Sequence, residues 1–320
     1  MNKPASSLTE QDFVRLPADR SMADAIVRPS VSYWRDVLRR IRSDKVAIVS
    51  LTFLVIIILM AIFAPILSPY GYETTDLLHT NQPPSVEHWF GTDAGGRDLW
   101  TRVWVGARIS LIIGLGGAIV PQIIGIFLGG LSGFFGGWVD MLLMRITEIF
   151  SSLPFLPFAM MLSYVIRTMP IGENTRIFII MIILGLLSWT GLARMIRAQV
   201  LAEREKEFVI AAKSMGVKEN RIAFKHILPN VISIILVNIT LDFAGCMLTE
   251  SSLSYLGFGV QQPQPTWGNM LNGANNSIVI QNFWWQWLFP AIALSVATIS
   301  INIIGDTLRD VLDPKSSQEK

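Results

Sequence analysis

Long apolar segments separated by polar loops run through most of the chain. Six of them are long enough to cross about 30 Å of hydrocarbon as helices, which rise about 1.5 Å per residue. They cover residues 46–67, 109–135, 146–166, 177–193, 227–249 and 283–305. Pro154 and Pro157 interrupt the third segment, so this helix is expected inside a bundle, where neighbours satisfy the freed backbone groups. The pattern predicts an all-α polytopic membrane protein with six transmembrane helices.

The composition agrees with a membrane protein. Of the 320 residues, 51% are hydrophobic and 16% are charged, whereas an ordinary soluble domain carries about 25% charged residues. The net charge of +2 is too small to indicate nucleic acid as a partner. The single cysteine, Cys246, lies inside an apolar segment, which excludes an intrachain disulfide and favours a packing role.

The lysines and arginines predict the orientation, because these residues resist translocation. Of the 26, 21 precede the first segment, follow the last, or fall in the second and fourth loops. The loop between residues 250 and 282 has none. Both termini and the large fourth loop are therefore predicted to be cytoplasmic. The five on the opposite side are Arg97, Arg102, Arg108, Arg167 and Arg176.

Seven tryptophans fall in or beside the loops predicted to lie outside. Their amphipathic rings favour the headgroup level, so we expect them to anchor the bundle there. They are Trp89, Trp100, Trp104, Trp267, Trp284, Trp285 and Trp287.

One stretch of the fourth loop, EFVIAAKSMGVKENRIAFKHILPN (residues 207–230), has the pattern of a short helix. Phe208, Ala211, Ala212 and Met215 recur at helical spacing along one stripe, and Gly216 is placed to end the helix in the left-handed conformation. An amphipathic helix lying flat on the headgroups is one interpretation, but Ala-Ala-Lys-Ser offers it little apolar area. A helix that docks into a groove of a separate protein fits the pattern better.

This stretch resembles the EAA loop of ABC importer permease subunits, which reads EAA, three residues, Gly, nine residues, an apolar position, then x-Leu-Pro. The chain matches this spacing at Ala211, Ala212, Gly216, Leu228 and Pro229. It departs from the pattern with Ile210 at the Glu position and His226 at the apolar position.

Three further stretches are similar to the oligopeptide/dipeptide (OppC/DppC) type of these permeases. They are HWFGTDAGGRDLWTRVWVGARISL (88–111), SYLGFGVQQPQPTWGNML (254–271) and GDTLRDVLDP (305–314). The resemblance extends from about residue 31 to residue 314.

The resemblance implies an inner-membrane permease subunit with the type I ABC importer fold. Its implied partners are a homologous second permease, two ABC ATPase subunits that bind ATP and Mg, and an extracytoplasmic peptide-binding protein. The chain itself would need no cofactor and would not be an enzyme alone. The helix in the fourth loop would be the coupling helix that contacts an ATPase. The implied coupling residues are Glu207, Phe208, Ala211, Ala212, Met215, Gly216, Leu228 and Pro229.

The bounds of the apolar segments and of the resemblance divide the chain into predicted regions. The first four are a mobile cytoplasmic tail (1–30), a basic pre-membrane segment (31–45), a first transmembrane helix (46–67) and an extracytoplasmic loop (68–108). A permease core (109–314) with a coupling loop (194–226) and a C-terminal tail (315–320) follow.

Polar residues inside the apolar segments are candidates for a translocation path, because ionisable groups at bilayer depth usually face a cavity or a partner helix. Asn238, Asp242, Gly245 and Thr249 form one continuous helical stripe in the fifth segment. They either line a water-filled path or, for Asn238 and Asp242, hydrogen-bond to another helix or to the second permease subunit.

Other motifs point to structure rather than chemistry. The sequence has no GxxxxGK[ST] phosphate-binding loop, and its three histidines are widely separated, so neither a nucleotide site nor a metal site is expected. The glycine-rich GIFLGGLSGFFGG (125–137) is expected to allow close helix packing. Asp93 and Asp98, beside Arg97, are expected to cap and pair locally at a turn followed by a helix start.

Two other functions compete with an ABC permease. An ion-coupled secondary transporter would show internal repeats and several intramembrane ionisable groups, and neither is evident beyond Asp242. A membrane scaffold would only recruit a partner through the fourth loop. Within the ABC family, the sequence leaves open peptides, nickel complexes and haem as substrates.

Overall fold

The computed structural model describes residue 39 and residues 41–312, so the predicted tails 1–30 and 315–320 and most of segment 31–45 lie outside it. The described residues are helical and hold no strand. The helices are α3 (Lys45–Leu67), α4 (Leu99–Phe135), α5 (Gly137–Ser151), α6 (Phe155–Thr168), α7 (Glu173–Arg204), α8 (Glu207–Ser214), α9 (Glu219–Ile222), the π-helix η3 (Ala223–Ile227), α10 (Leu228–Tyr255), α11 (Trp267–Gly273), α12 (Ser277–Asn282) and α13 (Trp285–Leu312).

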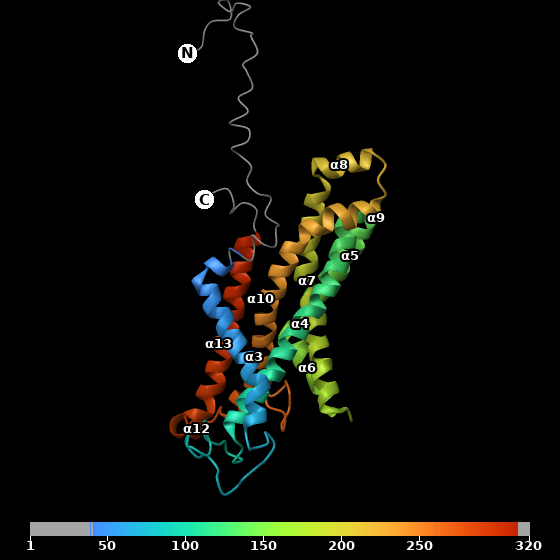
Figure 1. Cartoon of the computed structure of the whole chain (residues 1–320). Helices are drawn as coiled ribbons and strands as arrows, with labels where there is room; N and C mark the ends of the chain where they lie inside the picture. The colour runs from blue at the N-terminus through green and yellow to red at the C-terminus, as the bar shows by residue number, and fades with distance from the viewer. Residues whose placement is uncertain (1–38, 40, 313–320) are drawn as a thin grey trace, which may run out of the picture. The chain divides into compact units, whose positions relative to one another are not determined.

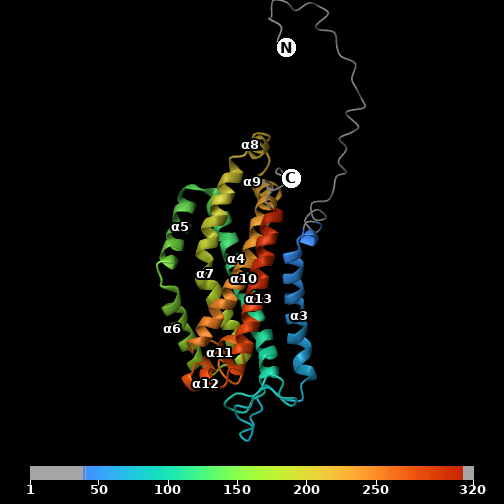
Figure 2. The same ribbon diagram turned by 90° about the vertical axis from the view of Figure 1, so that its left-hand side faces the viewer.

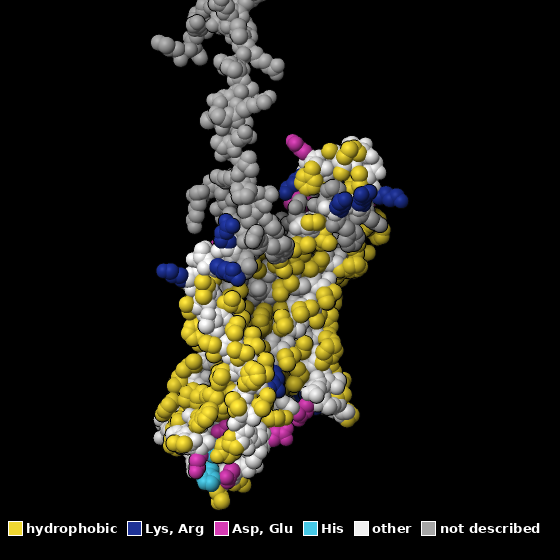
Figure 3. Space-filling view, in the orientation of Figure 1, with side chains coloured by type: hydrophobic (Ala, Val, Ile, Leu, Met, Phe, Trp, Pro, Cys, Tyr) yellow, Lys and Arg dark blue, Asp and Glu magenta, His cyan; other side chains and the backbone are white. Residues whose placement is uncertain are grey.

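Five helices are long and apolar enough to cross a membrane, namely α3, α4, α7, α10 and α13, and the bent pair α5 and α6 can make a sixth span. They run side by side in both views (Figure 1, Figure 2). Helices α8 and α9 lie at one end of this bundle, which we call the α8 end, and the loop of residues 68–98 lies at the other, the loop end. Hydrophobic side chains cover the long helices, and lysines and arginines gather mainly at the α8 end (Figure 3). The all-α polytopic prediction is thus confirmed.

The third predicted span differs from the prediction. Residues 146–166 are not one helix, because the chain breaks between Ser151 and Phe155 and bends by 76°. Pro154 stands at this break, where it precedes the first residue of α6. Pro157 does not interrupt the helix, since in the first turn its missing N–H has no intrahelical partner to lose.

Other helices continue beyond the predicted spans. Helix α4 begins at Leu99, ten residues before the predicted start, because the Asp98 side chain accepts a hydrogen bond from the Thr101 N–H at 2.9 Å and caps the helix. Helix α10 continues to Tyr255, so Glu250, predicted to begin a loop, lies inside a helix. The hydropathy pattern marked only the apolar part of each helix.

The glycine-rich segment packs closely against α7, as predicted. Gly125, Gly129 and Gly133 recur every four residues on one face of α4, and a Cβ at any of them would collide with α7. Helix α4 makes its most extensive contacts with α7. Because lipid gives no hydrophobic drive for helix association, this backbone approach is a main source of packing energy.

The tryptophans predicted to form a belt differ in exposure. Trp89 and Trp284 are exposed, as headgroup anchors would be, but Trp267 is fully buried and Trp285 is nearly so. The Trp267 indole N–H donates to the Val103 carbonyl at 3.0 Å. The belt prediction is therefore wrong for Trp267 and Trp285, which belong to the core of the loop end.

Candidate functional site

The short helix of the fourth loop is α8, and it ends as predicted at Gly216. Gly216 has a φ of +75°. Its N–H donates to the Lys213 carbonyl at 3.0 Å, and the Val217 N–H donates to the Ala212 carbonyl at 3.2 Å, which together form a Schellman cap. A Cβ at Gly216 would meet no atom within 4 Å, so the backbone angle alone demands glycine there.

The burial of α8 differs from the predicted stripe. Ala212 is buried at 4% exposure, whereas Phe208 is 43% exposed and Met215 is 77% exposed. Val209, outside the stripe, is also 4% exposed. Positions 209 and 212 share the inner face of α8, and its exposed positions include Phe208, Ile210 and Ala211, with Met215 exposed just past its end. Ala212 supports the helix from below and does not present its side chain to a partner.

The inner face of α8 belongs to an apolar cluster, the α8 cluster, that joins several helices. Its members are Leu192, Ile196 and Val200 of α7, Val209 and Ala212 of α8, Ile222 of α9, Ile227 of η3, and Val231 and Ile235 of α10. Ile126 and Phe134 of α4 pack against it. The α8 cluster therefore links α8 to α4, α7 and α10 through closely packed side chains.

Helix α10 starts from a single π-helical turn. The Leu228 N–H donates to the Ala223 carbonyl, five residues earlier. Such wide turns are rare and often occur at functional sites. Of the two coupling residues predicted here, Leu228 is half-buried and Pro229 is exposed. The side chain of His226 lies outside what the structure describes.

The polar stripe of α10 is only partly brought together. Asp242, Gly245 and Thr249 line an open cavity of about 200 Å³ with Pro121 of α4 and Leu184 and Ser188 of α7. Asn238 does not line it, and its amide donates to the Ile234 carbonyl at 2.8 Å and to the Met195 sulfur of α7 at 3.6 Å. Asp242 also accepts a hydrogen bond at 2.8 Å from Gln122 of α4. Asp242 therefore hydrogen-bonds to another helix, as one alternative predicted, and it also borders a cavity.

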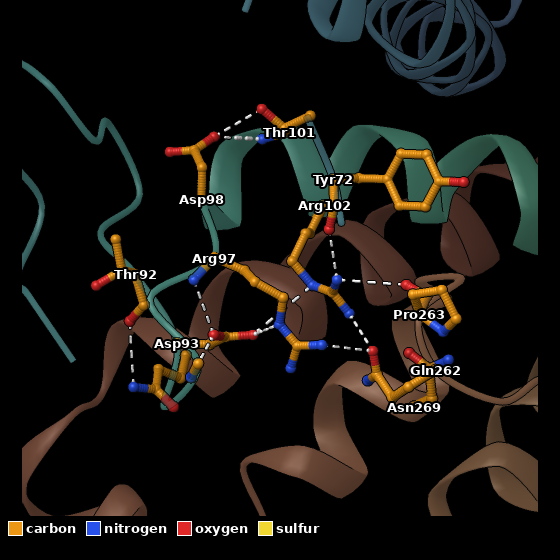
Figure 4. Close-up of polar contacts among 12 residues, drawn as sticks. Tyr72, Thr92, Asp93, Arg97, Asp98, Thr101, Arg102, Gln262, Pro263 and Asn269 are labelled. Carbon is orange, nitrogen blue, oxygen red and sulfur yellow. Dashed lines mark hydrogen bonds and ion pairs between the residues drawn. The ribbon is translucent and has the colours of Figure 1, made fainter. Parts of the chain in front are cut away.

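The loop end is fixed by a polar network (Figure 4). Asp93 bonds the Arg97 backbone N–H at 3.0 Å and pairs with the Arg97 side chain at 2.8 Å, as the local-turn prediction required. Arg102 is 1% exposed and donates to the Gln262 side-chain oxygen at 2.7 Å and to the Tyr72 carbonyl at 2.7 Å. Segments far apart in sequence are thereby joined by charge-assisted hydrogen bonds.

Two buried charged residues were missed by the sequence reasoning. The count of lysines and arginines placed Arg102 in a loop on the predicted outer side and gave it no other role. Glu250 is fully buried, with its carboxylate accepting from the Ser254 hydroxyl at 2.6 Å and lying 3.4 Å from the Ser110 hydroxyl of α4. The sequence signal for Glu250 is the run ESSLS (250–254), which supplies small hydroxyl donors within one turn.

The fold and these sites define a polytopic helical membrane protein with a short helix held at one end by an apolar cluster. Comparison with known families agrees with this class. Residues 123–318 match the model of the binding-protein-dependent transport system inner membrane component, and residues 32–84 match the N-terminal TM domain of oligopeptide transport permease C.

Characterised relatives cover nearly the whole chain. The oligopeptide transport system permease protein OppC of Bacillus subtilis is 43% identical over 95% of this chain and 96% of its own length. The dipeptide transport system permease protein DppC of the same organism is 41% identical, over 97% of this chain and 94% of its own length. OppC of Haemophilus influenzae is 42% identical over 95% of both chains.

The chain belongs to the family of binding-protein-dependent transport system inner membrane components, of the OppC/DppC type. It is a permease subunit of an ABC importer in the inner membrane, and it is not an enzyme on its own. The family implies that a substrate-binding protein and ATPases belong to the same system.

Proposed function

We propose that this chain forms one half of a peptide translocation path. Its partners would be a homologous second permease, two ABC ATPase subunits that bind ATP and Mg, and an extracytoplasmic peptide-binding protein. Support for peptides comes from the names of the relatives, which are oligopeptide and dipeptide permeases. The chain itself needs no cofactor in this proposal.

The α8 end would face the cytoplasm, together with both termini. Of the 26 lysines and arginines, 21 fall on the side of the sequence that this orientation leaves inside. This bias is the usual determinant of topology in inner-membrane proteins.

The outer face of α8 would dock in a cleft of an ATPase subunit. The observation that carries this proposal is the two-sided construction of α8, with Phe208 and Met215 exposed above Val209 and Ala212, which are buried in the α8 cluster. Exposed apolar side chains on a short helix are typical anchors for a groove. Glu207, Ala211 and Gly216 would complete the contact.

ATP binding and hydrolysis would move α8 as a rigid body and alternately open the path to each side. The α8 cluster supplies the transmission, since packed apolar side chains move together. The movement would reach the cavity at Asp242, Gly245 and Thr249 because α10 contributes to both the cluster and the cavity. Leu228 and Pro229, at the start of α10, lie on this route.

The assembly is tested by co-purification in mild detergent. The chain carries a C-terminal tag and Ser214→Cys, an exposed position at the end of α8, as a crosslinking site. We expect recovery of a homologous permease and two ATPases, with a crosslink to one ATPase. Thr52→Cys, on the exposed surface of α3, is the matched control and should give no ATPase crosslink. Recovery of the chain alone would contradict the proposal and favour a secondary transporter.

A further inference from the structure

The cavity beside α10 has an unusual balance of hydrogen-bonding groups. Its polar side chains are Asp242, Thr249 and Ser188, and the rest of its lining is Pro121, Leu184, Gly245 and Cys246. No lysine or arginine is among these residues. The ion pairs found among the described residues do not include Asp242.

The hydroxyl groups of Ser188 and Thr249 already donate their protons to backbone carbonyls. The Ser188 hydroxyl donates to the Leu184 carbonyl at 2.7 Å, and the Thr249 hydroxyl donates to the Gly245 carbonyl at 2.8 Å. A hydroxyl has one proton but two lone pairs, so both oxygens are left as acceptors. With the Asp242 carboxylate, the cavity offers acceptors and no strong donor.

A neighbouring amide strengthens this imbalance. Gln122 is 3% exposed and donates to Asp242 at 2.8 Å. Its side-chain oxygen is buried and has no hydrogen-bond partner among the described residues. A neutral donor leaves the charge of the carboxylate uncompensated, and such a group within a membrane span calls for a cation or a water-filled surrounding.

We propose that this cavity is a transient subsite for a primary ammonium group of the cargo, with Asp242 as its counter-charge. An ammonium has three donors and no acceptor, which is the complement of this lining. The N-terminus of a peptide and a lysine side chain both supply this group. The inference rests on the proposed function, since it places the cargo beside α10.

The subsite would also bind the cargo weakly enough to let it pass along the path. Asp242 already accepts one hydrogen bond from the Gln122 amide, and the remaining acceptors of the cavity are neutral. The ammonium would therefore be held by one charge-assisted contact. A path must bind its cargo weakly enough to release it. One ammonium-carboxylate contact meets that requirement, whatever side chains follow in the peptide.

The test compares two cargos in the reconstituted transporter, with both permeases, the ATPases and the binding protein in proteoliposomes. One peptide has a free N-terminus and the other is its N-acetylated counterpart, and both are delivered from binding protein shown to be loaded. The variant is Asp242→Asn, whose amide oxygen still accepts from Gln122. We expect the uptake rate of the free peptide to fall about tenfold, and that of the acetylated peptide to change less than about twofold.

An N-acetylated peptide with one lysine separates the two sources of ammonium. If its uptake also depends on Asp242, the subsite accepts side-chain ammonium groups, and if not, it takes the N-terminus alone. Asp306→Asn removes an exposed carboxylate from α13 and is the matched control, expected to leave the ratio of the two uptake rates unchanged.

An equal loss for both cargos would overturn the subsite, because Asp242 would then act only by joining α10 to α4. An unchanged uptake of both would overturn it as well. Absence of ATP-dependent uptake of either peptide by the unmodified complex would instead contradict the proposed function. Gln122→Leu removes the hydrogen bond to Asp242 and adds a second test. If that bond only joined the two helices, this variant would lower the uptake rates of both peptides equally, which would count against the subsite.

Discussion

The two ends of the helical bundle differ in the contacts that hold α8 at one end and Arg102 at the other. At the α8 end, α8 rests on the α8 cluster, and the side chain of its N-cap residue, Lys206, makes no capping hydrogen bond. At the loop end, the fully buried Arg102 joins Tyr72 and Gln262 with directional, charge-assisted bonds. Apolar contacts tolerate small sliding movements, whereas a network of directional bonds fixes one geometry. We therefore expect movement at the α8 end and a fixed geometry at the loop end.

The largest effect is expected at the rigid end, from Arg102→Met. The substitution removes the charge-assisted hydrogen bonds that the buried Arg102 donates to the Tyr72 carbonyl and to the Gln262 side-chain oxygen, which also accepts from Arg97 at 2.9 Å. Their loss should cost about 3 kcal/mol or more of unfolding free energy. Denaturation of the purified chain in detergent measures this loss. Arg102→Lys keeps the charge but not the planar fork, so its loss should be intermediate. A fully stable Arg102→Met would contradict the rigid loop end.

At the α8 end, Ala212→Leu should cost about 1–3 kcal/mol, because it forces a larger side chain into the α8 cluster. Its neighbour provides the control, since Ala211 is exposed and Ala211→Leu should leave the stability of the isolated chain nearly unchanged. Unfolding of both variants in detergent tests the assignment of inner and outer faces. Equal losses for the two would show that the faces are wrongly assigned.

A smaller effect is expected where α5 is tied to α7. The Arg197 guanidinium pairs with Asp140, which also accepts from the Ser132 hydroxyl. Because both charged groups are partly exposed, Asp140→Asn should cost only about 1 kcal/mol, measured by the same denaturation. Glu148→Gln breaks the exposed pair with Arg145 and should have no measurable effect. A larger loss for Glu148→Gln than for Asp140→Asn would refute this ranking.

The smallest effect concerns an exposed pair in the loop of residues 68–98. The hydrogen bond from His79 lowers the pKa of Asp76 below its usual 3.8, and the same bond raises the pKa of His79 above its usual 6.5. The His79 contribution to stability is full below pH 6.5 and lost as pH rises through its folded pKa. The Asp76 contribution is full above pH 3.8 and lost as pH falls through its folded pKa.

This pair is therefore most effective between pH 3.8 and 6.5. An NMR titration of the His79 ring should have its midpoint above 6.5 and return to about 6.5 in Asp76→Asn. Glu73→Gln, in the same loop, should leave the midpoint in place. A midpoint that Asp76→Asn does not lower would show that the bond is absent in solution.

The sequence predicted the five long spans and the short capped helix because both rest on local patterns. Hydropathy marks each apolar segment, and Gly216 marks a left-handed turn whatever surrounds it. The break in the third span was only half predicted, since two prolines at nearly equal positions have different effects. Pro154 precedes a helix, whereas Pro157 lies in its first turn, and that distinction depends on where the helix starts.

Long-range contacts were beyond the sequence reasoning. Nothing local to Gln122 indicates that it meets Asp242, which is 120 positions away. Likewise, nothing in the sequence around Trp267 indicates that its indole N–H donates to the Val103 carbonyl. The predicted docking stripe on α8 is wrong at Ala212 for the same reason. Periodicity shows which residues share a face of a helix, but it does not show which face packs against the rest of the chain.

The claim that α8 transmits movement as a rigid body is tested most directly at Gly216. A valine there has space for its Cβ but resists the positive φ, at a cost of about 1–2 kcal/mol. We predict that Gly216→Val lowers the ratio of peptide uptake to ATP hydrolysis about fivefold or more in the reconstituted complex. Gly216→Asn tolerates the left-handed conformation and should keep the ratio near that of the unmodified chain. An unchanged ratio in Gly216→Val would contradict the account.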